Sequence, residues 1–174
     1  MSIARLPGIP IIMYAREQTI IATPIGTIRL VAAGDALESV TIERDRTVSR
    51  GTSTLLQAAS RQIDQWFAGE RQLFDLPLVP IASPRGAVLR AGIMAISYGN
   101  MLSYGALARS LNSSPRAIGQ ACARNPLPII VPCHRVLAAG GILGAYSGGE
   151  GPATKAWLLA HEQRYGAVDA ERLI

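Results

Sequence analysis

The chain has 174 residues, 49% of them hydrophobic, which is enough for one domain or two small domains with a buried core. Its net charge of +5 is unevenly distributed: residues 1–83 balance eight arginines with eight acids, whereas residues 84–174 carry nine basic residues and four acids. No acidic residue occurs between positions 76 and 149. A basic half of this kind favours an anionic partner such as nucleic acid.

Several protein classes are disfavoured by what the sequence lacks. The apolar run at residues 9–13 is short and interrupted by Pro10, so it predicts neither an export signal nor a membrane span, and we expect a cytoplasmic protein. The two cysteines, Cys122 and Cys133, have none of the paired spacings of a zinc site, and reduced thiols are favoured over a disulfide between them. No phosphate-binding glycine motif occurs, so no cofactor is predicted.

The N-terminal part is predicted to contain a small antiparallel sheet. Two β-prone runs, at residues 19–23 and 27–32, flank the turn-forming residues 24–26, a pattern typical of a hairpin. Residues 37–42 offer a third strand.

A helix and a linker are predicted to complete this part. Thr54 with Gln57 three residues later fits a capping box, and apolar residues then recur at helical spacing until Gly69. The proline-punctuated stretch at residues 76–80 predicts a linker that packs on the surface rather than swinging free.

The second half is predicted to contain a pair of short helices. Ser103 can cap a helix over residues 104–111, and Ser114-Pro115 places a capping hydroxyl before a proline at the first position of the next helix. Arg116 would lie at the exposed start of that second helix. This order is typical of a helix-turn-helix unit, although most short helix pairs bind nothing.

Two further helices are predicted around this pair. One covers residues 88–96, and the other starts near Pro152 and stops before Gly166. Trp157 and His161 would share the buried face of the last helix.

The chemistry of the chain is indicated by Cys133 and His134, which are adjacent in an acid-free stretch. A neighbouring base favours the reactive thiolate, although a buried inert cysteine beside a surface histidine is the common alternative. Adjacent residues of a strand point to opposite sides, so cooperation of the two needs either a turn, which Pro132 favours, or a bridging water. Glu162 on the last helix could accept a hydrogen bond from His134 and orient it, with Glu150 as the competing acid.

Five segments resemble the O6-alkylguanine-DNA alkyltransferase family. The most specific is residues 125–136, NPLPIIVPCHRV, and it is supported by SYGALA at 103–108, GAYSGG at 144–149 and KAWLL at 155–159. Residues 73–78 resemble the family's interdomain junction. The resemblance implies an α+β fold.

In that fold, an N-terminal sheet-plus-helix domain of the RNase H-like kind, residues 1–80, precedes a winged helix-turn-helix-like domain, residues 84–174. The second domain would carry both the DNA-binding surface and the nucleophile. We also expect a monomer.

The resemblance also implies a suicidal transfer of a methyl or larger alkyl group from O6-alkylguanine, or alternatively O4-alkylthymine, to the protein itself. Cys133 would be the acceptor, His134 would take its proton through a water, and Glu162 would orient His134. Asn125 would brace the active-site turn, and Tyr104 would donate a hydrogen bond to the leaving guanine.

Further residues would bind the substrate, which is double-stranded DNA held through its minor groove. Arg116 would enter the base stack after the target nucleotide has flipped out. Tyr146 and Ser147, with the backbone of Val136, would line the base pocket, and Arg135 is placed with these DNA-binding residues.

The sequence departs from the family at Arg85 and Arg90, where aromatic residues are usual. We expect the helix that carries them to pack less tightly and its arginines to extend the DNA-binding face.

Two alternatives to the alkyltransferase function remain open. One is a non-enzymatic DNA-binding protein, either a lesion-binding relative, which would lack Cys133, or a helix-turn-helix regulator. The other is an unrelated thiol hydrolase.

Overall fold

The computed structural model describes residues 16–44 and 46–171, with the side chains of 167–171 left out. The apolar run at residues 9–13 therefore lies outside the described part of the chain. None of the described helices is long and apolar enough to cross a membrane.

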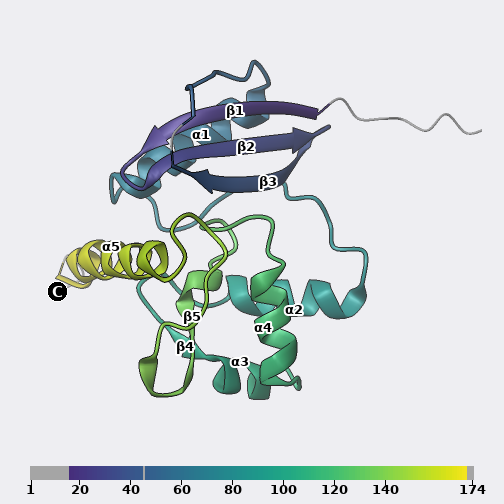
Figure 1. The fold of residues 1–174 in the computed structure, drawn as a ribbon, viewed down its shortest axis with the longest axis vertical. Helices are drawn as coiled ribbons and strands as arrows, with labels where there is room; N and C mark the ends of the chain where they lie inside the picture. The colour runs from purple at the N-terminus through teal and green to yellow at the C-terminus, as the bar shows by residue number, and fades with distance from the viewer. Residues whose placement is uncertain (1–15, 45, 172–174) are drawn as a thin grey trace, which may run out of the picture.

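The N-terminal part contains a three-stranded antiparallel sheet in the order β1-β2-β3. Its strands are β1 (Arg16–Thr23), β2 (Gly26–Ala33) and β3 (Ala36–Glu43), so the predicted hairpin and third strand are confirmed. Ile28 and Leu30 of the central strand are fully buried because α1 covers one face of the sheet (Figure 1).

Helix α1 (Thr54–Phe67) is confirmed, but its predicted cap is wrong by one residue. The capping hydroxyl belongs to Ser53, which accepts a hydrogen bond from Leu56 N at 3.3 Å. Thr54 is already helical, so it cannot occupy the extended conformation that an N-cap requires.

The linker after α1 pairs with the edge of the sheet. Leu37 N donates to Pro77 O at 2.8 Å, and Val79 N donates to Leu37 O at 3.0 Å. These bonds confirm that the segment packs on the surface. Beside them, Val40 N of β3 donates to Pro126 O at 2.8 Å, so the sheet also supports a turn of the second half.

Three short helices follow: α2 (Pro84–Met94), α3 (Tyr104–Ser110) and α4 (Pro115–Ala123). Each begins after a serine whose side chain accepts from a backbone N–H of the first turn; these serines are Ser83, Ser103 and Ser114. The caps of α3 and α4 are as predicted. Helix α2 starts earlier than predicted because its serine cap and first-position proline precede the apolar periodicity.

Short irregular elements connect α3 and α4 to the rest. Strands β4 (Leu102–Ser103) and β5 (Val136–Leu137) form a parallel pair, and two 3-10 turns, η1 (Cys133–Arg135) and η2 (Ala139–Gly141), flank β5. Thus β4 leads directly into α3, while β5 directly follows the turn η1, which begins with the predicted nucleophile.

The last helix, α5 (Pro152–Glu171), starts where predicted, but its predicted stop before Gly166 is wrong. Gly166 lies inside the helix beside Tyr98 and Gly99. One interior glycine costs a helix only about 1 kcal/mol, so packing along the rest of α5 outweighs it.

One hydrophobic core joins the two halves. The same cluster contains Ile28 of the sheet, Trp66 of α1, Ile93 of α2 and Leu158 of α5. The active-site segment is packed into this cluster through Leu127, which is fully buried. The chemistry of the second half therefore rests on a core that both halves build.

Candidate active site

Cys133 lies in a tight turn rather than in a strand. Pro132 precedes the 3-10 turn η1, in which Arg135 N donates to Pro132 O at 3.0 Å. Cys133, His134 and Arg135 are each at most 4% exposed. The predicted bend is confirmed, and His134 is buried rather than on the surface.

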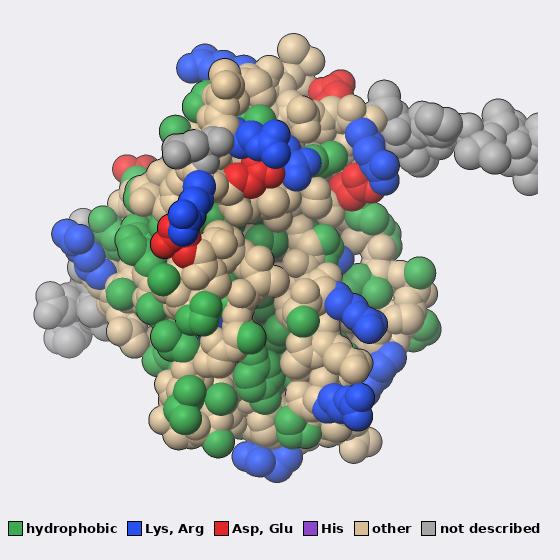
Figure 2. Space-filling model, in the orientation of Figure 1, with side chains coloured by type: hydrophobic (Ala, Val, Ile, Leu, Met, Phe, Trp, Pro, Cys, Tyr) green, Lys and Arg blue, Asp and Glu red, His purple; other side chains and the backbone are tan. Residues whose placement is uncertain are grey.

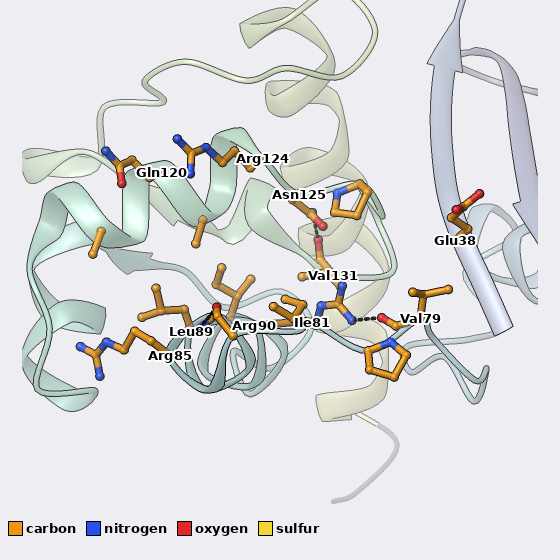
Figure 3. A pocket seen from close by; sticks show the side chains of 17 residues that line it. Glu38, Val79, Ile81, Arg85, Leu89, Arg90, Gln120, Arg124, Asn125 and Val131 are labelled. Carbon is orange, nitrogen blue, oxygen red and sulfur yellow. Dashed lines mark hydrogen bonds between the residues drawn. The ribbon is translucent and has the colours of Figure 1, made fainter. Parts of the chain in front are cut away.

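Asn125 holds the turn that leads to the nucleophile. Its Nδ2 donates to Val131 O at 2.8 Å (Figure 3) and to Cys133 Sγ at 3.1 Å, while its Oδ1 accepts from Leu127 N at 3.1 Å. Within this turn Ile129 has φ of 74°, which is rare for a β-branched residue. Burial of Ile129 offsets a strain of about 1–3 kcal/mol.

His134 is bonded to Glu162 in a fully buried pair. The distance from His134 Nε2 to Glu162 Oε1 is 2.7 Å. Burial lowers the pKa of His134, although the nearby Glu162 partly opposes this change. A neutral imidazole beside a carboxylate donates its Nε2–H, so Nδ1 is left as an acceptor. This Nδ1 is buried and has no hydrogen-bond partner among the described residues, so it is available to take a proton.

Glu162 is held as a carboxylate by a second partner, Arg135. Arg135 Nε donates to Glu162 Oε2 at 2.9 Å and Nη2 donates to Oε1 at 2.9 Å, while Gly99 N donates to Oε2 at 3.1 Å. Burial alone would raise the pKa of Glu162, but the bonds and charges of His134 and Arg135 outweigh it and lower the pKa to about 2.

The prediction that Arg135 contacts DNA is wrong. Its side chain is 4% exposed, and besides binding Glu162 it donates to the carbonyl of Ile96. The sequence could not reveal this ion pair because the partners are 27 positions apart. Arg135 therefore lies behind the nucleophile and fixes the charge of Glu162.

Lys155 was not predicted as a functional residue, yet it lies in the site. It is the single lysine of the chain, and it is fully buried. Its Nζ donates to Val136 O at 2.7 Å and lies 5.9 Å from the ring centre of Tyr104. The sequence did contain a signal for this role, because the chain's one lysine, beside sixteen arginines, lies in a segment that resembles the family.

The two thiols differ in their environments. Burial raises the pKa of Cys133, but the Asn125 hydrogen bond, the charge of Lys155 and local backbone bonds oppose that rise. Burial raises the pKa of Cys122 to about 12, with Cys133 adding to the rise and Lys155 opposing it. Only Cys133 has hydrogen bonds that favour its thiolate.

A cavity of about 180 Å³ opens beside Cys133. It is lined by Tyr104, Gly119, Cys122, Ala123, Cys133, Ala145, Tyr146 and Ser147. Burial raises the pKa of Tyr104, which keeps its hydroxyl protonated as a donor. Val136 does not line this cavity, and its carbonyl is occupied by Lys155.

The α3–α4 pair presents a basic surface next to this cavity. Arg116 is exposed at the start of α4, one residue after Pro115. Figure 2 shows acidic side chains over the sheet, whereas the lower part of this face carries only basic ones. The acid-free stretch of the sequence thus forms a surface suited to a polyanion.

Arg85 and Arg90 both form hydrogen bonds to backbone carbonyls, a role that was not predicted for them. Arg85 Nη2 donates to Asn112 O at 2.8 Å, just after α3, and Arg90 Nη1 donates to Val79 O of the linker at 2.8 Å (Figure 3). Both line a cavity of about 680 Å³ between α2, α4 and the linker. Their guanidinium groups therefore tie α2 to neighbouring backbone, and Arg90 does not extend a DNA-binding face.

Because the pKa values of several buried groups are lowered, we expect the protein to lose stability as the pH decreases. Glu162 has a folded-state pKa of about 2 against its ordinary 4.5, and the pKa values of His134 and His161 are also lowered by burial. The unfolded chain thus binds protons more readily than the folded chain, so stability is lost as pH falls below about 6.5, and further below about 4.5. Urea unfolding between about pH 7 and about pH 3 should show this decrease; a constant midpoint would contradict it.

Comparison with known proteins places this site in a family. Residues 85–164 match the family 6-O-methylguanine DNA methyltransferase, DNA binding domain. A methylated-DNA–protein-cysteine methyltransferase of Methanosarcina acetivorans is 33% identical over 138 residues, covering 75% of this chain and 88% of that protein. A DNA base-flipping protein of Thermus thermophilus is 45% identical over 102 residues, covering 58% and 68%.

Comparison of the fold with solved structures indicates the same family. The crystal structure of Mycobacterium tuberculosis OGT in complex with DNA matches with a TM-score of 0.70 and 32% identity, covering 84% of this chain and 92% of that one. Its mixed α and β architecture agrees with the predicted α+β class. The chain belongs to the family of methylated-DNA–protein-cysteine methyltransferases.

Proposed function

We propose that this protein repairs alkylated DNA by moving the alkyl group from O6 of guanine onto Cys133. The observation that carries this proposal is the arrangement around one sulfur. Asn125 donates to Cys133 Sγ at 3.1 Å, and the sulfur shares a cavity with Tyr104. Behind it, the imidazole of His134 and the carboxylate of Glu162 form a buried pair, with Nε2 and Oε1 2.7 Å apart.

The reaction starts with the proton of Cys133. His134 Nδ1 accepts this proton through a bridging water, and Glu162 stabilises the imidazolium that forms. The Asn125 amide and the Lys155 charge stabilise the thiolate. Arg135 acts only as a positioning residue, because it holds Glu162 ionised.

The thiolate then displaces guanine in line from the alkyl carbon. A carbon–sulfur bond forms as the carbon–oxygen bond breaks, and the electron pair of the broken bond passes to the base. Tyr104 donates a hydrogen bond to the guanine as this charge develops. The guanine leaves as its neutral base once it is protonated, and the proton that His134 took from Cys133 balances this uptake. A thioether resists hydrolysis at neutral pH, so each molecule acts once.

The substrate reaches the cavity by base flipping. O6 of a paired guanine is inaccessible to a buried thiol, so the nucleotide must leave the stack. We propose that α3 and α4 enter the minor groove, where contacts carry little sequence information, and that Arg116 fills the vacated position. Tyr146 and Ser147 then line the pocket around the flipped base.

We further propose the finer architecture and the working form of the protein. Residues 1–80 form an RNase H-like domain, and residues 84–174 form a winged helix-turn-helix-like domain, in which β4 and β5 stand beside the helix pair. One chain contains every catalytic group named above, which supports a protein that acts as a monomer. We also propose that it acts in the cytoplasm.

A direct experiment tests the proposed activity. The protein is incubated with excess duplex DNA containing O6-methylguanine, and its intact mass is followed over time. We expect the mass of one methyl group per chain, located in the tryptic peptide of residues 125–135, and no further change. Methylation elsewhere, or continued turnover beyond one equivalent, would exclude the mechanism.

Arg116→Ala should separate flipping from chemistry. We expect transfer from methylated duplex DNA to slow by about 10-fold or more, since the variant lacks the side chain that holds the base out, a step worth a few kcal/mol. Transfer from free O6-benzylguanine should change little, because a free base needs no flipping. Rates on both substrates are compared with those of Arg61→Ala, an exposed arginine on α1. Equal losses on both substrates would rule out the flipping role.

A non-enzymatic role in lesion recognition is the second candidate, because the Thermus thermophilus relative is named a DNA base-flipping protein. The presence of Cys133 among hydrogen-bond donors disfavours it for this chain. In the mass experiment this alternative predicts tight binding to the lesion with no change in protein mass.

A further inference from the structure

Cys122 has no role in the proposed transfer, yet it lines the same cavity of about 180 Å³ as Cys133. It lies in the last turn of α4, is 8% exposed and is a free thiol. The two cysteines of the chain therefore both border this one small cavity.

Asn125 connects the two cysteines structurally. Its backbone N–H donates to Cys122 O at 3.2 Å, and its side-chain amide donates to Cys133 Sγ at 3.1 Å. A single residue therefore fixes the end of α4 against the turn that carries the nucleophile. The backbone of Cys122 and the sulfur of Cys133 are thus held by the same residue, and both cysteines line one cavity.

We propose that Cys122 is a resolving thiol, which forms a disulfide with Cys133 when hydrogen peroxide oxidises the active site. In the first step the Cys133 thiolate attacks the peroxide: its sulfur gains an OH group to become a sulfenic acid, and hydroxide leaves. In the second step the Cys122 sulfur displaces that OH group, its proton joins the leaving hydroxide as water, and the sulfur–sulfur bond forms.

The consequence is protection of a residue that the protein can use only once. The groups that make Cys133 a nucleophile toward carbon also make it a nucleophile toward peroxide oxygen. Without a nearby thiol, the sulfenic acid proceeds to sulfinic and sulfonic acids, which are irreversible losses of the acceptor. A disulfide stores the sulfur in a form that thiols reduce again.

This inference uses the reactive Cys133 of the proposed function, but its test needs no alkyl transfer. The protein is treated with hydrogen peroxide, quenched, and its intact mass is measured without reduction. We expect a loss of two hydrogens and one cross-linked pair of tryptic peptides, residues 117–124 and 125–135, which Arg124 separates. Dithiothreitol should restore both free thiols.

Two variants make the result decisive. In Cys122→Ala, the same treatment should add oxygen atoms to the peptide of residues 125–135, and dithiothreitol should not remove those of the higher acids. In Cys133→Ser, Cys122 should remain a free thiol, since oxidation starts at Cys133. Oxygen addition at Cys133 in the unmodified protein, with Cys122 still free, would overturn the proposal, as would a disulfide that joins two chains. Failure of alkyl transfer alone would leave these masses unchanged.

Discussion

Cys133→Ser is expected to abolish measurable alkyl transfer while DNA binding is retained. A serine hydroxyl ionises far less readily than a thiol at neutral pH, so the Asn125 bond and the Lys155 charge cannot supply enough nucleophile. The helices proposed to bind DNA, α3 and α4, are formed by other residues, and the substitution replaces one small buried atom by another. Transfer is followed with labelled O6-methylguanine duplex, and binding is followed by fluorescence anisotropy.

The same variant decides between the two cysteines. Residual methylation of Cys133→Ser would make Cys122 the acceptor, although burial raises the pKa of that thiol to about 12. Loss of both transfer and DNA binding would instead indicate that the variant had not folded, which circular dichroism would show.

Glu162→Gln is expected to slow transfer by about 10²-fold, the scale on which general-base catalysis contributes. An amide can donate as well as accept, so it no longer forces His134 to keep its proton on Nε2. The carboxylate also raises the pKa of His134, so its removal should shift the acid limb of the rate profile to lower pH. The rate on free O6-benzylguanine, measured across pH and corrected for the folded fraction, is the test.

Glu150→Gln is the matched control for this substitution. Glu150 was the competing acid in the sequence, but it is exposed and pairs with Arg44 at 2.8 Å, away from His134. Its rate and pH profile should therefore equal those of the unmodified protein. Because Glu162→Gln leaves Arg135 buried without a charge partner, its melting temperature should also fall; a lower melting temperature with an unchanged pH profile would reduce Glu162 to a structural residue.

Local signals explain why much of the fold could be predicted. Ser103 before α3, Ser114 before α4 and the proline at the first turn of α4 act within a few residues of where they stand. The hairpin likewise depends on Gly26, whose φ of 110° suits glycine, between two β-prone runs. Such features can be predicted because the capping or turn residue lies close in sequence to the helix or hairpin that it determines.

Contacts between distant residues explain the failures. Arg135 was predicted to contact DNA and Lys155 was given no role, but each is buried by elements that the sequence does not place beside it. Arg90 binds a linker carbonyl, and Gly166 continues a helix because of what that helix packs against. The pairing of His134 with Glu162 rather than Glu150 was predicted only because a helix holds a side chain more firmly than a glycine loop.

The neighbour of Glu162 on α5 has a consequence for how the protein can fail. His161 Nε2 is 2.9 Å from Trp66 O, and its ring stacks among the aromatic side chains of α1 and α5. His161 therefore holds α5 against the N-terminal half, and the next residue, Glu162, is the one proposed to orient the catalytic base. A change that loosens α1 would therefore be expected to shift Glu162 and slow alkyl transfer, although α1 carries none of the proposed catalytic groups.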